Sequence, residues 1–174
     1  MKKIHVIARN WGNGDGGAGY LNSLAFYTKD DVKLEVTDIV GIGSGGGVTF
    51  KLNGINARIE WFNNYSGYKP VDIFSTGASY NYTILLHQMN SYPVEKQGFY
   101  IYFDKDIRNI AYITLLTTYY PANNFVVSID DGKYTEPVTT SGNEVFRIPL
   151  PRTSIKCIRG KNGRYYFLRP KASA

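Results

Sequence analysis

The fold is indicated most clearly by the stretch VTFKLNGINARIEWF, residues 48–62. Apolar and polar residues alternate on both sides of Asn53-Gly54, which is the period of two expected for half-buried β-strands. Asn-Gly tolerates the positive φ angles of a type I′ turn, so a hairpin with its register set at this turn is predicted. Arg58 and Glu60 should face outward. The alternate residues of the second strand should face the core: Ile55, Ala57, Ile59 and Trp61.

The same rhythm recurs along most of the chain, and neither a long amphipathic helix nor a repeat of fixed period interrupts it. A Gly-Ser-Gly-Gly-Gly run at 43–47 is predicted to be a linker after the opening unit. The sequence therefore predicts one all-β domain over residues 1–174, a jelly-roll-like antiparallel β-sandwich of about ten short strands with a basic C-terminal hairpin and tail at 152–174. Further strands are predicted at 4–9, 20–27, 33–40, 99–103, 110–120, 125–129, 145–150, 155–158 and 164–168. Residues 63–98 are the least regular part, with one short apolar run at 82–86.

Composition limits the class of protein. A chain of 174 residues can bury one sizeable core without staples. Cys157 is the only cysteine, so no disulfide can form within the chain and an oxidising compartment gains no support. The start of the chain reads as a first strand and not as a signal peptide, and no stretch approaches the roughly 20 apolar residues of a membrane span. We therefore expect a protein made in the cytoplasm, without membrane insertion.

The net charge of +6 is unevenly distributed. Cations before residue 152 are dispersed among acids, whereas the tail concentrates them. This tail could contact phosphate, lipopolysaccharide or an acidic subunit, but a solvated face that keeps the protein soluble is the favoured interpretation, and nucleic acid is not expected as a partner. The cations of the tail are Arg152, Lys156, Arg159, Lys161, Arg164, Arg169 and Lys171.

Two segments resemble the discoidin-like, or galactose-binding-like, β-sandwich family. The first runs from Arg9-Asn10-Trp11-Gly12 into the strand at 19–27, and the second runs from 99–104 through 110–114 to the Asp-Gly turn that ends at Gly132. The Asn53-Gly54 hairpin and the missing terminal disulfide depart from the family pattern. The resemblance implies an accessory binding module of the kind found on bacteriophage tails, fibres and capsid surfaces.

Catalytic groupings are sparse in the sequence. Asp104 and Asp106 lie at a strand end and Asp130-Asp131 lie in a turn, where carboxylates usually have structural roles. The two histidines, His5 and His87, show no metal-binding spacing with each other or with Cys157. The sequence therefore predicts that the protein is not an enzyme.

Binding residues are expected in loops that combine aromatic rings with amides, because rings pack on sugar C–H faces and amides bond hydroxyls. Similar loops also serve protein partners, so glycan and protein remain alternatives. No cofactor is expected, except that Asn13 and Asp15 could hold a structural calcium ion. The candidate ligand-binding residues are Asn10, Trp11, Asn13, Asn63, Asn64, Tyr65, Tyr68, Tyr80, Tyr119 and Tyr120.

These features predict a non-catalytic structural protein of a virion surface or tail that carries a binding module and possesses affinity for host carbohydrate. Its expected partners are other virion subunits, in a homo- or hetero-oligomeric assembly, and a glycan. Two alternatives stay open: a purely architectural capsid decoration or cement protein, and a carbohydrate-binding accessory domain of a hydrolase system.

Overall fold

The computed structural model describes residues 1–11, 19–42, 46–61, 70–75, 84–86, 93–118, 122–138, 145–151, 156–159 and 165–168. It describes the backbone alone at 84–86, 156–159 and 165–168 and at the ends of several other strands. Two main sheets dominate this part of the chain. Their strands are β1 (Lys3–Trp11), β2 (Gly19–Tyr27), β3 (Val36–Ile42), β4 (Gly47–Leu52), β5 (Ile55–Trp61), β6 (Ile84–Leu86), β7 (Phe99–Phe103), β8 (Tyr112–Thr118), β9 (Ala122–Ile129) and β10 (Val145–Pro149).

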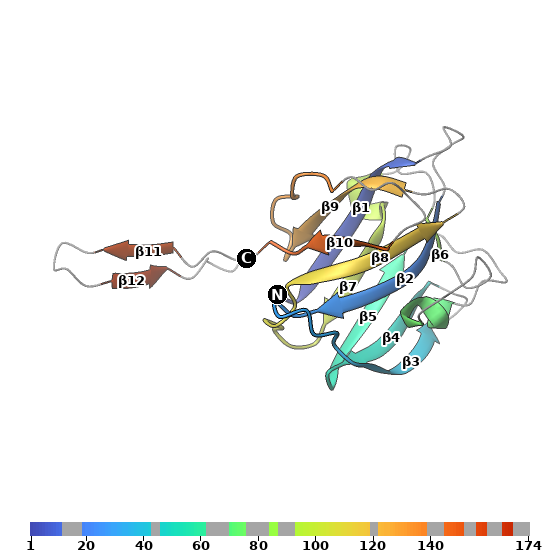
Figure 1. The fold of residues 1–174 in the computed structure, drawn as a ribbon, viewed down its shortest axis with the longest axis horizontal. Helices are drawn as coiled ribbons and strands as arrows, with labels where there is room; N and C mark the ends of the chain where they lie inside the picture. The colour runs from blue at the N-terminus through green and yellow to red at the C-terminus, as the bar shows by residue number, and fades with distance from the viewer. Residues whose placement is uncertain are drawn as a thin grey trace.

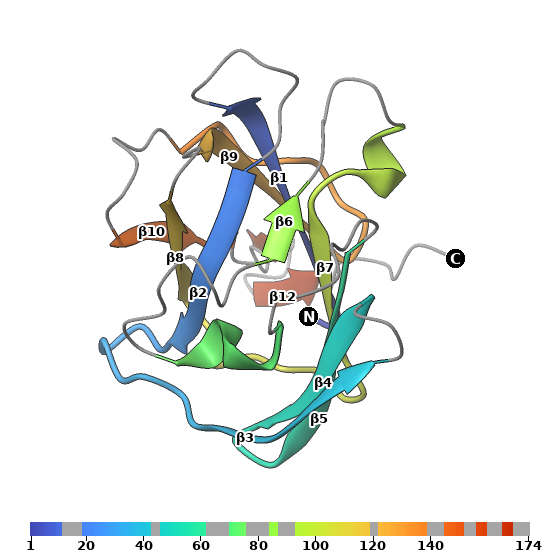
Figure 2. The same ribbon diagram turned by 90° about the vertical axis from the view of Figure 1, so that its right-hand side faces the viewer.

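The strands form two layers, a six-stranded sheet in the order β3-β4-β5-β7-β1-β9 and a four-stranded sheet in the order β10-β8-β2-β6. Neighbouring strands are antiparallel throughout, and Figure 2 shows the two layers face to face. Outside the β3-β4-β5 meander, consecutive strands lie in opposite sheets (Figure 1). The prediction of an all-β, jelly-roll-like antiparallel sandwich is therefore confirmed. A separate two-stranded sheet joins β11 (Lys156–Arg159) to β12 (Tyr165–Leu168).

The predicted central hairpin forms with the predicted register. Leu52 lies opposite Ile55, and the turn residues Asn53 and Gly54 have φ angles of 46° and 78°. Ala57, Ile59 and Trp61 of β5 are buried, whereas Arg58 and Glu60 on the alternate positions are partly exposed. The period of two thus separates a core face from a solvent face, as expected for a half-buried sheet.

Phenylalanine rings join the two sheets across the core. Phe26 of β2 stacks on Phe50 of β4 with centroids 5.9 Å apart, and its ring also meets Phe103 of β7 at 6.4 Å. The 3-10 helix η1 (Pro70–Phe74) closes one side of the sandwich beside β2 and β3, with Phe74 4.7 Å from Phe50. The buried residues of the described part of the chain form one hydrophobic cluster between the two sheets.

The glycine-rich run at 43–47 is not a linker between units, and that prediction is wrong. Ile42 pairs with Gly47, so β3 and β4 are antiparallel neighbours in one sheet. The strand predicted at 33–40 begins at Val36 and is almost wholly exposed. Its register shifts between Thr37 and Val40. A bulged, solvent-facing strand is suited to a sheet edge, where irregularity discourages pairing with other chains.

A close backbone approach precedes β7. The short 3-10 helix η3 (Val94–Lys96) leads to Gly98, which has a φ of 63°. A Cβ on Gly98 would lie 1.8 Å from the carbonyl oxygen of Val6 in β1. Only glycine, which has no Cβ, can therefore occupy this position so close to the backbone of β1.

We predict that Gly98→Ala lowers the free energy of unfolding by at least about 3 kcal/mol, because it combines a left-handed backbone with a clash against Val6. Gly54→Ala is the matched control, since Gly54 also has a positive φ but has open space at its Cβ position. We expect the control to cost about 1 kcal/mol. Urea denaturation measures both values, and equal losses would contradict the assigned close approach.

Candidate binding face on the six-stranded sheet

Two rows of polar and aromatic residues cross the outer face of the six-stranded sheet. Register places Arg58 of β5 opposite Tyr102 of β7, and Tyr102 opposite Lys3 of β1. Two residues further along each strand lies the second row, in which Tyr100 pairs with Glu60 of β5 on one side and with His5 of β1 on the other. We call Lys3, Arg58, Glu60, Tyr100 and Tyr102 the tyrosine platform.

The aromatic rings of the platform stack in sequence. Tyr100 lies 5.7 Å from Tyr102 and 3.8 Å from the imidazole of His5, with nearly parallel planes in both pairs. Cations cover these rings: the guanidinium of Arg58 is 4.2 Å from the centroid of Tyr102, and Lys3 Nζ is 4.9 Å from that of Tyr100. Contacts of this kind stabilise by roughly 0.5–1 kcal/mol at exposed sites and restrain the long cationic side chains.

Each of these cations is also neutralised by a carboxylate. Lys3 Nζ binds Asp131 Oδ1 at 2.7 Å, and Arg58 Nε binds Glu60 Oε1 at 2.6 Å. Next to the platform, Lys51 Nζ binds Asp38 Oδ2 at 2.7 Å. The face therefore offers many hydrogen-bonding groups but little net charge.

His5 anchors the buried end of the second row. Its Nε2 lies 2.7 Å from the carbonyl oxygen of Gln97, which can only accept, so Nε2 donates. In the neutral ring Nδ1 then accepts from the hydroxyl of Tyr134, also 2.7 Å away. The Tyr100 hydroxyl donates to the carbonyl of Glu95 at 2.8 Å. These bonds hold the stacked rings in one orientation.

A groove of about 260 Å³ adjoins the platform on β4 and β5. Arg58 belongs to both features, and Lys51 and Asp38 form their ion pair at the groove. A ligand on the platform could extend into this groove and meet further amide, hydroxyl and carboxylate groups. The lining residues are Asp38, Thr49, Phe50, Lys51, Asn56, Ala57, Arg58 and Asp104.

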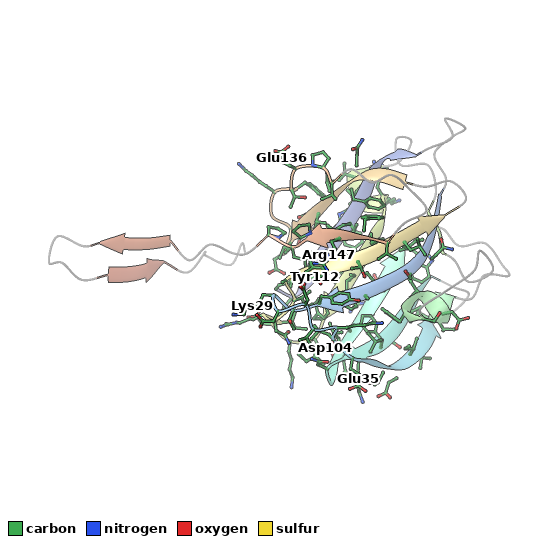
Figure 3. All side chains as sticks on the ribbon, in the orientation of Figure 1. Lys29, Glu35, Asp104, Tyr112, Glu136 and Arg147 are labelled. Carbon is green, nitrogen blue, oxygen red and sulfur yellow. The ribbon has the colours of Figure 1, made fainter. Side chains whose placement is uncertain are left out.

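The outer face of the four-stranded sheet carries a smaller cluster of the same chemistry. The rings of Tyr27 and Tyr112 stack with centroids 5.0 Å apart, and the guanidinium of Arg147 lies 4.7 Å from the centroid of Tyr112. Asp31 Oδ1 accepts from the Tyr112 hydroxyl at 2.8 Å and from Arg147 at 3.2 Å. Figure 3 shows Tyr112 and Arg147 side by side.

A second groove, of about 370 Å³, lies beside η1 and the β3 edge. Val36, Ile39, Val71 and Phe74 give it an apolar lining, while Lys33, Glu35, Asp72 and Ser75 supply polar groups. The aromatic stack and the paired charges lie elsewhere, so the platform is the better candidate for specific recognition.

The candidate residues predicted from sequence fall mostly outside the described residues. Asn10 and Trp11 end β1, where their backbones pair with Asn123 and Ala122 of β9, but their side chains are not described. The other candidates lie wholly outside the described residues: Asn13, Asp15, Asn63, Asn64, Tyr65, Tyr68, Tyr80, Tyr119 and Tyr120. The suggested calcium ligands Asn13 and Asp15 are among them.

The strand ends that flank several of these predicted loops lie at one end of the sandwich (Figure 1). β1 and β5 both pair antiparallel with β7, so they run in the same direction. Their last residues, Trp11 and Trp61, therefore lie at the same end of the sandwich. Ala122 of β9 lies opposite Trp11, and it follows Thr118, the end of β8 in the other sheet, by only four residues. Four residues of chain reach no further than about 14 Å, so the end of β8 and the start of β9, which belong to different sheets, lie within that distance of each other.

Three of the four carboxylates considered for catalysis, those of Asp106, Asp130 and Asp131, have structural partners. Asp106 binds the N-terminal amino group and Arg108, while Asp130 Oδ1 accepts from the backbone amides of Lys2 and Lys3. Asp131 forms its ion pair with Lys3. Within the part of the chain that the structure describes, no three His, Cys, Asp or Glu side chains gather to hold a metal ion. No helix in that part is long and apolar enough to cross a membrane.

Sequence reasoning missed the platform, although a signal for it exists. In Phe-Tyr-Ile-Tyr-Phe, residues 99–103, the two tyrosines occupy alternate positions and so share the face opposite to the buried Phe99, Ile101 and Phe103. The same alternation places Arg58 and Glu60 outward on β5. Only the strand order, which puts β7 between β5 and β1, brings these residues together.

Protonation at the platform is set largely by burial. Burial, followed by the neighbouring Tyr134, raises the pKa of Tyr100 to about 12, and burial also raises the pKa of Tyr102. The hydrogen bond to Asp131 is the main cause that raises the pKa of Lys3. Both tyrosines therefore stay neutral hydrogen-bonding groups at physiological pH, and Lys3 stays charged.

We predict an alkaline loss of stability that depends on Tyr100. An unfolded tyrosine releases its proton near pH 10 and folded Tyr100 only near pH 12, so its contribution is fully present below pH 10 and is lost as the pH rises towards 12. Denaturant unfolding should show up to about 2 kcal/mol less alkaline loss in Tyr100→Phe than in the wild type, because one pKa unit is worth about 1.4 kcal/mol. Identical pH profiles for the two proteins would contradict this assignment.

The chain matches no protein-family model, and no curated protein or solved structure matches it. The resemblance to the discoidin-like family, carried by the segments at 9–27 and 99–132, stays a prediction.

Proposed function

We propose that this protein is a non-catalytic binding domain that recognises a neutral carbohydrate through the tyrosine platform and its adjoining groove. The observation that carries this proposal is the pairing of charges on an aromatic face. Lys3, Arg58 and Lys51 each have a carboxylate within 2.7 Å, so the face presents oriented donors and acceptors without a charge excess. Such a surface matches a polyhydroxylated ligand, whose hydroxyl groups both donate and accept.

The platform also has the rigidity that recognition requires. Its residues stand on three adjacent strands. Gln97 and Tyr134 hold the imidazole of His5, and Tyr100 stacks on that imidazole and donates its hydroxyl to Glu95. Side chains restrained before binding lose less conformational entropy when a ligand arrives. A sheet face is in this respect a more precise support than a loop.

We propose further that the domain serves on a virus particle, as a surface or tail component that contacts other subunits. Double-sheet jelly rolls are used in viral capsids and in lectins, which is the combination of roles suggested for this chain. The cysteine-poor composition, rich in tyrosine and glycine, suits a part made in a reducing cytoplasm. This setting rests on fold-level analogy and composition.

The proposal predicts that Arg58→Ala weakens glycan binding by on the order of tenfold, equivalent to about 1.4 kcal/mol. The substitution removes the guanidinium from Tyr102 and releases Glu60. Arg147→Ala is the matched control, because Arg147 also lies over a tyrosine and pairs with an acid, but on the opposite sheet. A glycan array identifies the ligand, and calorimetric titration measures the affinity of the three proteins.

Equal losses in Arg58→Ala and Arg147→Ala would place recognition elsewhere than on the platform. An array without any binding would remove the carbohydrate proposal and leave the architectural decoration or cement role. The accessory role in a hydrolase system would instead be supported by stimulation of a partner hydrolase on polymeric substrate.

The loop residues predicted from sequence provide a separate test. If the end of the sandwich near Trp11 contributes to recognition, Trp11→Ala and Tyr65→Ala should each weaken glycan binding about tenfold or more, as loss of an aromatic contact would. Unchanged affinity in both variants, together with a loss in Arg58→Ala, would restrict the site to the platform. Circular dichroism melting provides the control for folding.

A further inference from the structure

The groove of about 370 Å³ between η1 and β3 lies beside a segment that exposes large apolar side chains. We call it the η1 groove; Figure 2 shows η1 next to the segment that joins β2 to β3. Among the described residues five large apolar side chains are exposed, and three of them, Val32, Ile39 and Val40, belong to the segment 32–40. Exposed apolar side chains that gather beside a groove mark a contact site for another molecule.

Charges of both signs line the η1 groove without partners of their own. Lys33, which is exposed, lies on the side of β3, and Asp72, which is half-buried, lies on the side of η1. Neither forms an ion pair within the described part of the chain, whereas the cations of the tyrosine platform are each paired with a carboxylate. Charges that lack a partner within one molecule are available to pair with charges of another.

The edge of β3 is not suited to pairing with a strand of another molecule. Its register shifts between Thr37 and Val40, and Asp38 has a φ of 51°. A bulge of this kind interrupts the row of amides and carbonyls that an added strand would need. A partner at this edge must therefore be bound through the side chains of the segment 32–40 and through the groove beside it.

We propose that two copies of this chain associate through the η1 groove about a two-fold axis. In such a contact the same patch of both copies is used, so the segment 32–40 of each copy enters the groove of the other. Ile39 of one copy then packs against Val71 and Phe74 of the other. Lys33 belongs to the entering segment and Asp72 to the receiving wall, so two symmetric ion pairs form across the axis.

A second copy fits this groove better than a polyanion or a small apolar ligand does. Glu35 and Asp72 would repel a polyanion, because Lys33 alone balances two acids. A small apolar ligand inside the groove would leave Lys33 and Asp72 unpaired at its rim. A second copy supplies both the apolar side chains and the opposite charges. This contact lies beyond the carbohydrate function proposed for the platform and does not depend on it, since the two sites share no residue.

The test measures self-association of the full-length chain by analytical ultracentrifugation, at concentrations up to about 1 mM. We expect Lys33→Glu and Asp72→Lys each to weaken self-association by at least about tenfold, because the symmetry brings each reversed charge into the contact twice. Lys133→Glu is the matched control, since Lys133 is also exposed but lies in the turn after β9, away from the groove. This control should keep wild-type affinity.

A mixture of the two single variants tests whether the ion pairs form between copies. Each reversed charge of Lys33→Glu then meets a reversed charge of Asp72→Lys in the other chain, so we expect the mixture to associate within about threefold of the wild-type affinity. A contact within one chain could not produce this rescue. Circular dichroism melting of each variant provides the control for folding.

A matched pair of apolar substitutions tests the packing. Ile39→Asp should weaken self-association at least about tenfold, whereas Val145→Asp, at an exposed apolar position on β10, should leave it unchanged. The proposal is overturned if the wild type stays monomeric at the highest concentration, if Lys133→Glu loses as much as Lys33→Glu, or if the mixture stays dissociated. A monomeric wild type that binds a dansyl-labelled fatty acid would overturn it as well. Arg58→Ala should leave self-association unchanged, so failure here is separable from failure of the carbohydrate proposal.

Discussion

Contact between the inner faces of the two sheets is the constraint on which the rest of the structure depends. Phe26 of β2 meets Phe50 and Phe103 of the opposite sheet, and Phe74 of η1 closes the side of this cluster. Because side chains alternate along every strand, burying one set of residues forces the other set outward. The tyrosine platform is thus the counterpart of the core: Tyr100 and Tyr102 lie on the outer side of β7 because Phe99, Ile101 and Phe103 occupy its inner side. Tyr102 is partly exposed there, whereas its neighbours on the sheet leave Tyr100 buried.

The two outer faces show how a sheet can carry cations without becoming a general polyanion site. Arg58 lies between Tyr102 and Glu60, and Arg147 lies between Tyr112 and Asp31. Exposed ion pairs contribute little to stability, typically below about 1 kcal/mol. In the proposed recognition these pairs would act on specificity, because a guanidinium fixed by a ring and a carboxylate presents donors in set directions and the pair adds no net charge.

The proposed role of the sandwich follows from this balance of charge. On the sandwich, cations and acids are almost equal in number and several are paired, which favours a neutral ligand that forms hydrogen bonds. In residues 152–174 the cations have no acids beside them in the sequence, which favours a partner that brings its own negative charge.

The sequence by itself determined the fold class, the hairpin register at Asn53-Gly54 and the burial of β5, because these depend on local alternation and turn chemistry. It did not predict the pairing of β3 with β4 across the glycine run, or the platform. Lys3, Arg58 and Tyr102 are far apart in the chain, and only strand order places them in one row. Tertiary structure alone decided this site, since strand order depends on how whole sheets bury their apolar faces, which no local pattern encodes.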